Sequence, residues 1–519
     1  MLLALLASIP FLVLFILLIP LKKPAVKALP IVWLTALLIS IFVWNINSIY
    51  IASSFVRAIF MTLEIMLIVL GAVWLLEIVK ETKQIQNIQN FLASISPDAR
   101  VQGLIIGWLF VSLMEGVAGF GTPAAIAAPL LVALGFKPIL AVSVALIGNS
   151  VATTFGAAGT PILLGFGSLG VDKIILESSG HISAILHGIA SIIIPISLVY
   201  IITREKKKKN AFKEMIPFSV FAWLVFSVPY VLTAIFIGPE LPSILASLLS
   251  LVVISYASKK KFLIPKQSFY FKKSNDKKLN LKGIISSILP YILVVSLLLV
   301  SRAVIPLKSF LQSISISYNS ILGSTVNFSY LPVFTPAFYF FISIMISSLV
   351  LKTPFKTIKT SFNNSLLKIK SATIALVFAL GFVQLLIFSS MNSRGLSSMP
   401  VLIAETLGNF FGMFYPFVSP FIGAFGSFIS GSNTVSNILF GVFQSESAIA
   451  LGISIPLILA LQAVGGAVGN MIAIHNVLAA SATVGIKHQE SLIIKKNIVV
   501  MLIYLLILGV LGMIAIRLF

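Results

Sequence analysis

The run Glu115-Gly-Val-Ala-Gly-Phe-Gly-Thr-Pro123 interrupts a series of apolar segments that are each long enough to cross a bilayer. It places a carboxylate, three glycines and a Thr-Pro step where an ordinary membrane helix holds leucines. A second polar run, Ser430-Gly-Ser-Asn-Thr-Val-Ser-Asn437, lies near the other end of the chain. One such interruption in each half is typical of secondary transporters, whose broken helices meet near the middle of the membrane.

The composition around these runs is that of a membrane protein. Of 519 residues, 59% are hydrophobic and 10% are charged, and the mean hydropathy is +1.10. Apolar runs near 20 residues predict an all-α polytopic protein with about 12–14 transmembrane helices and re-entrant segments near 119–135 and 430–446. A membrane β-barrel would show short alternating strands instead. The expected spans are 2–20, 29–45, 59–79, 101–118, 139–158, 182–203, 216–237, 241–258, 285–301, 331–351, 371–390, 401–422, 449–470 and 497–517.

The net charge of +22 is concentrated in a few short segments. Of the 36 Lys and Arg residues, 29 lie in the six segments 22–28, 80–100, 204–213, 259–283, 352–370 and 487–496. Basic segments that alternate with charge-poor connections indicate cytoplasmic loops, so we expect both termini outside the cell membrane. Nucleic-acid binding is the competing interpretation, but the lysine clusters follow directly on hydrophobic segments.

The chain divides into two halves that resemble each other. The Lys-rich segment 259–283 predicts a solvated inner linker between an N-terminal half, 1–258, and a C-terminal half, 284–519. Gly121 and Gly156 in the first half, and Gly431 and Gly466 in the second, are each separated by 35 residues. An inverted internal repeat is therefore expected. Residues 302–330 predict an outer loop with an amphipathic piece.

The interruptions contain the signals that start helices. Gly-Thr-Pro occurs at 121–123 and at 159–161, and Thr followed by Pro suits the first positions of a helix. Ser430, Ser432, Asn433 and Thr434 offer the same in the second half. Helix N-termini present free N–H groups and a partial positive charge, which suit an anion. The alternative is that small residues merely let helices pack closely.

Three carboxylates lie in apolar surroundings, namely Glu64, Glu115 and Glu405. A carboxylate there is costly unless it is paired or protonated, which makes Glu115 the candidate for a coupling proton. Glu64 is expected to pair with Arg57. Glu405 is expected near Arg394, as an outer gate or a surface pair.

Histidine and metal motifs add little. His475 is the second proton candidate, against the alternative of a buried histidine with satisfied hydrogen bonds. His181 and His187 are assigned no role. The chain has no cysteine, no zinc-ligand pattern and no Walker A motif, so no metal, cofactor or enzymatic activity is expected.

Several longer motifs resemble the L-lactate permease family in order and spacing from about residue 50 to the C-terminus. They are Ser96-Pro-Asp-Ala-Arg100, the run from Glu115 to Ile126, Leu134-Gly-Phe-Lys-Pro138, Phe155-Gly-Ala-Ala-Gly-Thr-Pro-Ile162, Phe236-Ile-Gly-Pro-Glu-Leu-Pro242 and the run from Gly431 to Phe440. The resemblance implies uptake of lactate, and often glycolate, by symport with protons. It also implies paired re-entrant hairpins and an elevator motion in a homodimer.

The chain departs from the family pattern at two positions. The family usually has Gly-Ser-Asp-Thr where this chain has Gly431-Ser-Asn-Thr434, and Gly-Lys-Met where it has Gly469-Asn-Met471. An acid and a base are thus both replaced by Asn. If they pair in the family, losing both avoids leaving one buried charge alone.

The sequence therefore predicts an importer of L-lactate or a related 2-hydroxy monocarboxylate, such as glycolate or D-lactate, by proton symport. Glu115 and His475 are the candidates for proton coupling. The alternatives are a sodium-coupled carrier of another organic anion, an anion channel, and an intramembrane enzyme, for which clustered acids are lacking. The expected substrate-binding residues are Gly119, Gly121, Thr122, Asn149, Thr160, Ser430, Ser432, Asn433, Thr434, Asn437 and Asn470.

Overall fold

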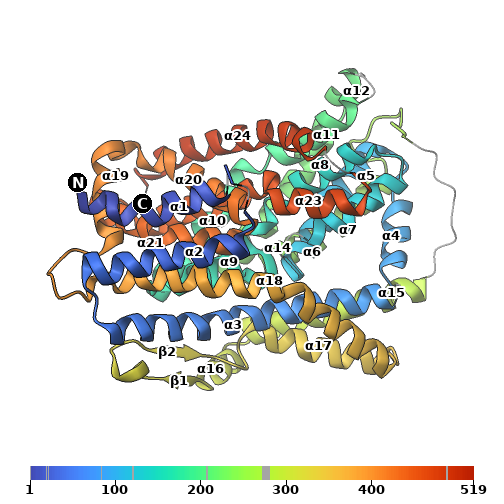
Figure 1. Cartoon of the computed structure of the whole chain (residues 1–519). Coiled ribbons are helices and arrows are strands. Elements are labelled where there is room, and N and C mark those ends of the chain that lie inside the picture. Colours follow the sequence, from blue (N-terminus) through green and yellow to red (C-terminus); the bar gives the residue numbers. More distant parts are fainter. Residues whose placement is uncertain are drawn as a thin grey trace.

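Long apolar helices run side by side along the molecule in the computed structural model (Figure 1). The structure describes residues 2–18, 20–21, 23–82, 84–119, 122–205, 209–271, 281–486 and 489–518. Within these ranges, 11 helices are long and apolar enough to cross a membrane, or 12 if a pair bent by 55° counts as one span. Three shorter apolar helices accompany them. The all-helical, multi-pass architecture is thus confirmed, with the number of long helices at the lower end of the prediction.

The described part of the first half contains six of the helices that are long and apolar enough to cross a membrane, together with the first set of broken helices. Its elements are α1 (Leu2–Leu18), α2 (Ala25–Ile39), η1 (Ser40–Trp44), α3 (Ser48–Glu81), α4 (Gln84–Ser94), α5 (Ala99–Leu104), η2 (Ile105–Phe110), α6 (Val111–Val117), α7 (Thr122–Ala133), α8 (Pro138–Asn149), η3 (Ala152–Phe155), α9 (Gly156–Leu163), η4 (Gly167–Leu169), α10 (Lys173–Ala190), α11 (Ile193–Arg204), α12 (Lys209–Lys213), α13 (Ile216–Phe236) and α14 (Pro242–Lys259).

The second half adds a small two-stranded ribbon. Its elements are α15 (Leu281–Ala303), α16 (Ile305–Ser313), β1 (Ile316–Tyr318), η5 (Ile321–Gly323), β2 (Phe328–Tyr330), α17 (Pro336–Val350), α18 (Phe355–Ile387), η6 (Phe388–Ser390), α19 (Met399–Phe411), η7 (Gly412–Phe414), α20 (Tyr415–Ser430), α21 (Asn433–Leu451), α22 (Ile455–Gly469), η8 (Asn470–Ile472), α23 (Ile474–Thr483) and α24 (Glu490–Ala515). The amphipathic piece expected in 302–330 is α16, whereas the antiparallel pairing of β1 with β2 was not predicted.

Each polar run forms the turn of a helical hairpin followed by a broken helix. In the first half α6 packs on α7, and the bent pair is formed by α8 and the 152–169 segment. In the second half α20 packs on α21 and on α22, and α22 gives way to α23 through η8. The two sets meet where α21 contacts α9. The expected re-entrant segments therefore correspond to α7 and α21.

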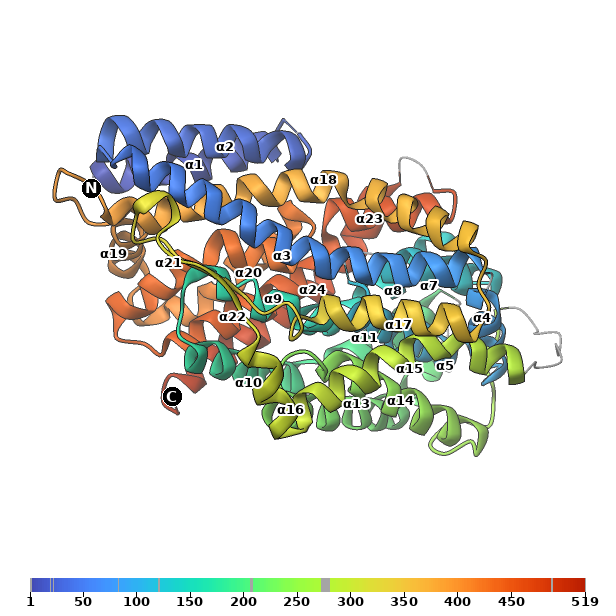
Figure 2. The ribbon, with the colours of Figure 1, turned by 90° about the horizontal axis from the view of Figure 1, so that it is seen from below.

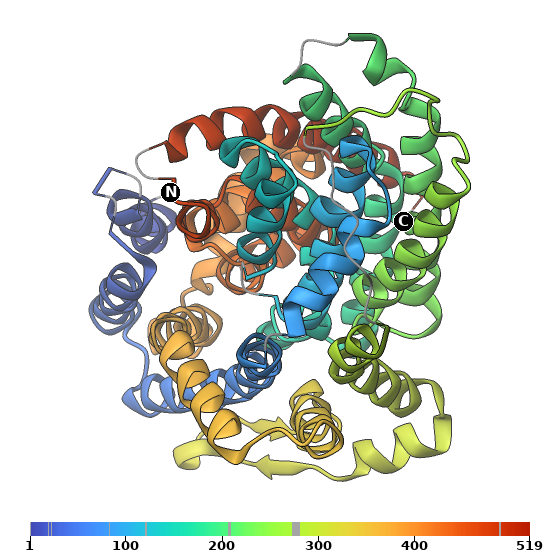
Figure 3. The same ribbon diagram turned by 90° about the vertical axis from the view of Figure 1, so that its right-hand side faces the viewer.

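The remaining helices surround these two sets. Viewed end-on in Figure 3, the dark blue α1 and α2 lie along the left edge and the yellow elements along the lower edge, around the teal and orange helices. Helices of the two halves are interleaved, because α18 packs along both α2 and α3. The turn between α1 and α2 lies part-way along the molecule, short of the end at which α4 lies (Figures 1 and 2). Lys23 lies in that turn and Lys27 in the first turn of α2, and both belong to the first basic segment.

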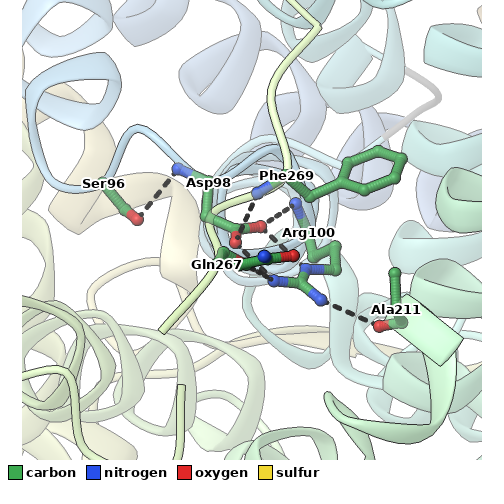
Figure 4. A network of polar contacts seen from close by, with 6 residues as sticks. All are labelled: Ser96, Asp98, Arg100, Ala211, Gln267 and Phe269. Carbon is green, nitrogen blue, oxygen red and sulfur yellow. Dashed lines mark hydrogen bonds and ion pairs between the residues drawn. The ribbon is translucent and has the colours of Figure 1, made fainter. Parts of the chain in front are cut away.

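Residues 259–271 of the expected linker are mostly exposed, but one of them is anchored in the fold. Phe269 is buried, and its N–H donates to the Asp98 carboxylate at 3.0 Å (Figure 4). Asp98 also accepts from Arg100, with Nη2 2.6 Å from Oδ2, and Arg100 in turn donates to the carbonyls of Ala211 and Gln267. The Ser96–Arg100 motif thus ties the linker and α12 to the start of α5. Residues 272–280 lie outside the described residues.

A second buried ion pair joins the end of α15 to the segment between α13 and α14. Arg302, at the end of α15, donates from Nε to Glu240 at 3.1 Å and from Nη2 to the Phe334 carbonyl. Its guanidinium carbon lies 4.1 Å from the centre of the Phe334 ring. Because a buried charge needs both a counter-ion and hydrogen bonds, these contacts account for a charged Glu240 in an apolar setting.

Candidate functional site

A polar cavity lies where the two sets of broken helices meet. Its lining comes from both polar runs: Glu115, Gly119, Thr153, Gly156, Ala157 and Pro161 from the first half, and Gly431, Ser432, Asn433, Thr434 and Asn470 from the second. The cavity has a volume of about 20 Å³. That volume is enough for roughly one water molecule, since one water needs about 10–15 Å³. A larger ligand would require the two sets of helices to move apart.

Glu115 is the one titratable residue among the lining residues that the structure describes. Its side chain is 3% exposed and accepts a hydrogen bond from Asn149 Nδ2 at 3.0 Å. Within the described part of the chain, no Lys, Arg or His forms an ion pair with it. A buried carboxyl with only an amide partner is strongly disfavoured as an anion, in contrast to Asp98 and Glu240.

In each half, a glycine lies directly against a polar side chain of the neighbouring hairpin. A Cβ at Gly156 would lie 2.6 Å from Glu115 Oε1, and one at Gly466 would lie 2.1 Å from Asn433 Oδ1. Neither position has room for a Cβ, which explains the glycine at 156 and at 466. Gly466 lies inside α22 and not at its break, which follows at Asn470. The inverted repeat itself stays a prediction.

The break that follows α8 includes strained backbone within the first residues of α9. Ala157 and Ala158 have φ values of 43° and 52°, and Gly159 has a φ of 80°. Left-handed geometry is unfavourable for alanine, so the surroundings must hold it. The Pro239 carbonyl would lie 2.5 Å from a Cβ at Gly159, and Ser243 Oγ donates to the Ala152 carbonyl at 2.8 Å. The Phe236–Pro242 motif and the adjacent Ser243 therefore pack against this break and support it.

The second-half hairpin turns without such strain. Gly431 adopts a φ of 74°, which glycine tolerates, and the Ser432 hydroxyl accepts from the Val435 N–H at 3.4 Å to cap α21. Ser432 therefore caps the start of α21, a helix of 19 residues, and the prediction that Ser432 begins a helix is confirmed. Thr160 differs, because its hydroxyl donates to the Ala157 carbonyl at 2.6 Å and does not cap a helix.

Most of the predicted binding residues are in or beside the polar cavity. Five of the predicted binding residues line it, namely Gly119, Ser432, Asn433, Thr434 and Asn470, and so does Glu115, the residue predicted for proton coupling. Asn149 and Asn437 lie just behind, bonded to Glu115 and to the Pro161 carbonyl respectively. Thr160 is buried behind Ala157, and the Ser430 hydroxyl donates to the Gly426 carbonyl. Gly121 lies outside the described residues, and Thr122 begins α7.

Two expected ion pairs are not formed by the described residues, and the proton-coupling role of His475 stays a prediction. His475 is exposed and does not line the polar cavity, although its Cβ would meet a Cβ placed at Gly431. Arg57 donates to Gln384 at 3.0 Å instead of pairing with Glu64. Arg394 donates to the Val43 carbonyl and forms no ion pair with Glu405, which is exposed. For both arginines, closeness in sequence did not predict the residue that each contacts in the fold.

His187 and four lining residues were missed. Thr153, Gly156, Ala157 and Pro161 belong to the second Gly-Thr-Pro region, which pointed to them without identifying which atoms face the polar cavity. His187 is fully buried between Thr154 Oγ1 at 2.7 Å and Tyr504 Oη at 2.8 Å. It connects the α8–α9 break to α24, and no local sequence signal indicates that contact.

Comparison with known proteins identifies the family. A family model described as L-lactate permease matches residues 3–519. The chain belongs to the L-lactate permease family. It is accordingly a transporter and not an enzyme, as the sequence motifs predicted.

Relatives with assigned names extend over nearly the whole chain. A Haemophilus influenzae protein of the L-lactate permease group is 34% identical over 507 residues, covering 93% of this chain and 92% of its own. L-lactate permease of Escherichia coli is 29% identical, and glycolate permease GlcA of Escherichia coli 28%, each covering 98% of this chain and 94% of its own. The solved YdaH transporter of Alcanivorax borkumensis is 13% identical with a TM-score of 0.43, covering 87% of this chain and 85% of its own.

Proposed function

We propose that this permease imports L-lactate or a related small 2-hydroxy monocarboxylate together with a proton, and that the polar cavity is the binding site. The observation that carries the proposal is the Glu115 carboxyl, which is buried at the junction of the two hairpins and forms no ion pair with any described residue. The lactate and glycolate permeases among its relatives support the substrate class.

The chemistry of the lining suits this task. Asn433 and Asn470 carry amide N–H groups, and Ser432 and Thr434 carry hydroxyls, at the start of α21 and at the break after α22. Such donors, together with the N-terminus of α21, would hold a carboxylate without a fixed positive charge. A protonated Glu115 would add a donor and leave the loaded site with only the charge of the substrate.

The size of the polar cavity supports alternating access as part of this proposal. At about 20 Å³ it is too small for a three-carbon acid, so one set of broken helices must move relative to the other to admit it. Protonation of Glu115 would then couple the motion to the proton gradient, because only the neutral form is readily buried in both arrangements. Homodimer formation and an elevator motion are further proposals from the family resemblance.

The test is uptake of labelled L-lactate into proteoliposomes under an imposed pH gradient, acid outside. We expect the wild-type protein to accumulate lactate and Glu115→Gln to lose gradient-driven accumulation while retaining exchange. Glu64→Gln is the matched control, since Glu64 is another carboxyl in apolar surroundings but does not line the polar cavity. Uptake indifferent to the gradient in the wild type, or full accumulation by Glu115→Gln, would remove the proposed coupling.

A sodium-coupled carrier is the second candidate, and one observation favours it. The Oδ1 atoms of Asn149, Asn433 and Asn437 are buried and accept no hydrogen bond within the described residues. Unsatisfied carboxamide oxygens are ligands for a hard cation as well as acceptors for a substrate hydroxyl. Uptake driven by a sodium gradient at equal pH on both sides would favour this carrier, and uptake without sodium would exclude it.

A further inference from the structure

An apolar cavity of about 370 Å³ lies on the far side of α6 from the polar cavity. It is enclosed by α4, by η2 and α6, and by the facing sides of α14 and α15. In Figure 2, α4, α14 and α15 lie together toward the end at which α4 is drawn. The volume exceeds many times the roughly 10–15 Å³ that one water needs, and cavities of this kind are rare in packed interiors.

The apolar cavity opens toward the bilayer between α14 and α15. Val252 and Tyr256 on α14 line it and are 69% and 65% exposed, and Ile292 on α15 lines it and is 48% exposed. α14 packs on α6 and α13, whereas α15 packs on α4 and α17. A hydrocarbon chain can therefore enter from the membrane without crossing water.

Two polar groups at the apolar cavity have chemistry that apolar packing does not explain. The Tyr291 hydroxyl is buried, on a side chain 4% exposed, and has no hydrogen-bond partner within the described part of the chain. A buried hydroxyl without a partner is costly, so it points to an acceptor supplied by a ligand. Lys259, in the last turn of α14, is the one charged lining residue, and Lys260 and Lys261 follow it.

We propose that this cavity binds one acyl chain of an anionic phospholipid. The chain would fill the apolar cavity between α14 and α15, an ester oxygen would accept from Tyr291, and the headgroup phosphate would lie at Lys259. Basic residues at the mouth of an apolar pocket between membrane helices are the arrangement that anionic lipid requires. No acidic residue occurs among the described lining residues to oppose it.

The lipid would support the helix that carries the coupling carboxyl. Met114 lines the apolar cavity, and the next residue, Glu115, lines the polar cavity. α6 thus separates the two cavities, and a chain on one side restricts how far α6 can shift away from the other. The lipid site itself does not depend on the identity of the transported acid.

The experiment measures lipid retained by the intact purified protein with native mass spectrometry, after exchange into phosphatidylglycerol or phosphatidylcholine with the same acyl chains. We expect one phosphatidylglycerol to be retained in preference to phosphatidylcholine. Lys259→Gln should weaken its retention roughly fivefold, the effect of one basic residue at an anionic surface. Lys359→Gln on α18, an exposed lysine of another basic segment, is the matched control and should retain the lipid.

A second pair of variants tests the apolar part independently. Leu251→Trp fills the apolar cavity and should abolish retention, whereas Leu249→Trp on the exposed face of α14 should leave it unchanged. Tyr291→Phe should weaken retention without loss of folded protein. Equal retention of both lipids, or equal effects of the two tryptophans, would overturn the proposal. So would a two-chain species that Leu251→Trp converts to one chain, because a second copy would then occupy this face.

Discussion

The two walls of the polar cavity differ in charge and in backbone. The wall from α6 to α9 carries Glu115 and a run of left-handed residues at 157–159, supported by the Phe236–Pro242 motif. The wall from α20 to η8 carries only hydroxyls and amides and turns at a single unstrained glycine, Gly431. One wall is thus suited to hold a proton, and the other to donate neutral hydrogen bonds to an anion.

The largest effect should come from making the second wall charged. Asn433→Asp alone would bury an unpaired carboxylate in the cavity that already holds Glu115, and should lower the free energy of unfolding by about 3–5 kcal/mol. Asn470→Lys alone would place an ammonium in the same cavity as Glu115, which could pair with it, so a smaller loss is expected. The double variant restores the acid and base usual in the family and should recover most of that loss.

Equilibrium unfolding of all four proteins in mixed micelles gives the coupling between positions 433 and 470. We expect a coupling of at least about 1 kcal/mol, as for residues in direct contact. Additive losses would mean that the two side chains do not pair, and that the second wall cannot accept charges in this chain.

The difference in backbone between the walls can be tested with two glycines. Gly159→Ala forces alanine to a φ of 80° with its Cβ 2.5 Å from the Pro239 carbonyl, and should destabilise the protein by about 3 kcal/mol. Gly431→Ala meets a side-chain atom, His475 Cβ, at 3.1 Å and should destabilise by only about 1–2 kcal/mol. Equal losses in thermal unfolding would show that both turns are held with equal rigidity.

Two histidines distinguish buried support from surface. His187→Phe leaves the hydroxyls of Thr154 and Tyr504 without partners and should lower stability by about 1–3 kcal/mol, while lactate uptake still follows the pH gradient. His475→Gln, at an exposed position, should change stability by about 0.5 kcal/mol or less and leave uptake unchanged. Loss of the pH-gradient dependence of uptake in His475→Gln would show that His475 takes part in proton coupling.

The smallest effect should be a gain. Ala157→Gly relieves a left-handed alanine, by about 1–2 kcal/mol, but adds flexibility to the unfolded chain, so a net stabilisation of about 0.5 kcal/mol is expected. Ala448→Gly inside α21 is the control and should cost about 1 kcal/mol. A loss at both positions would mean that the left-handed turn at 157 carries no strain.

Several features of the site were predictable because they are local. The Glu115–Pro123 and Ser430–Asn437 runs combine polar groups, glycine and helix-start residues within segments that must satisfy their own backbone in lipid, so they marked both hairpins. The partners of two arginines on different helices were not predictable in this way. Arg57 meets Gln384, and Arg302 meets Glu240, across helices far apart in sequence. The burial of Phe269 in a Lys-rich linker likewise depends on Asp98, far upstream in the chain.

The order of apolar and polar segments by itself determined a multi-pass helical protein with two interrupted regions, because hydrocarbon tolerates no unpaired backbone except where the chain turns inside protein. Only the tertiary structure decided that these regions face one another across a single cavity, and that Glu115 has no ion-pair partner among the described residues while Glu240 is paired with Arg302. The physical reason is that charge neutralisation depends on distances between helices, which packing sets and the linear order of residues does not.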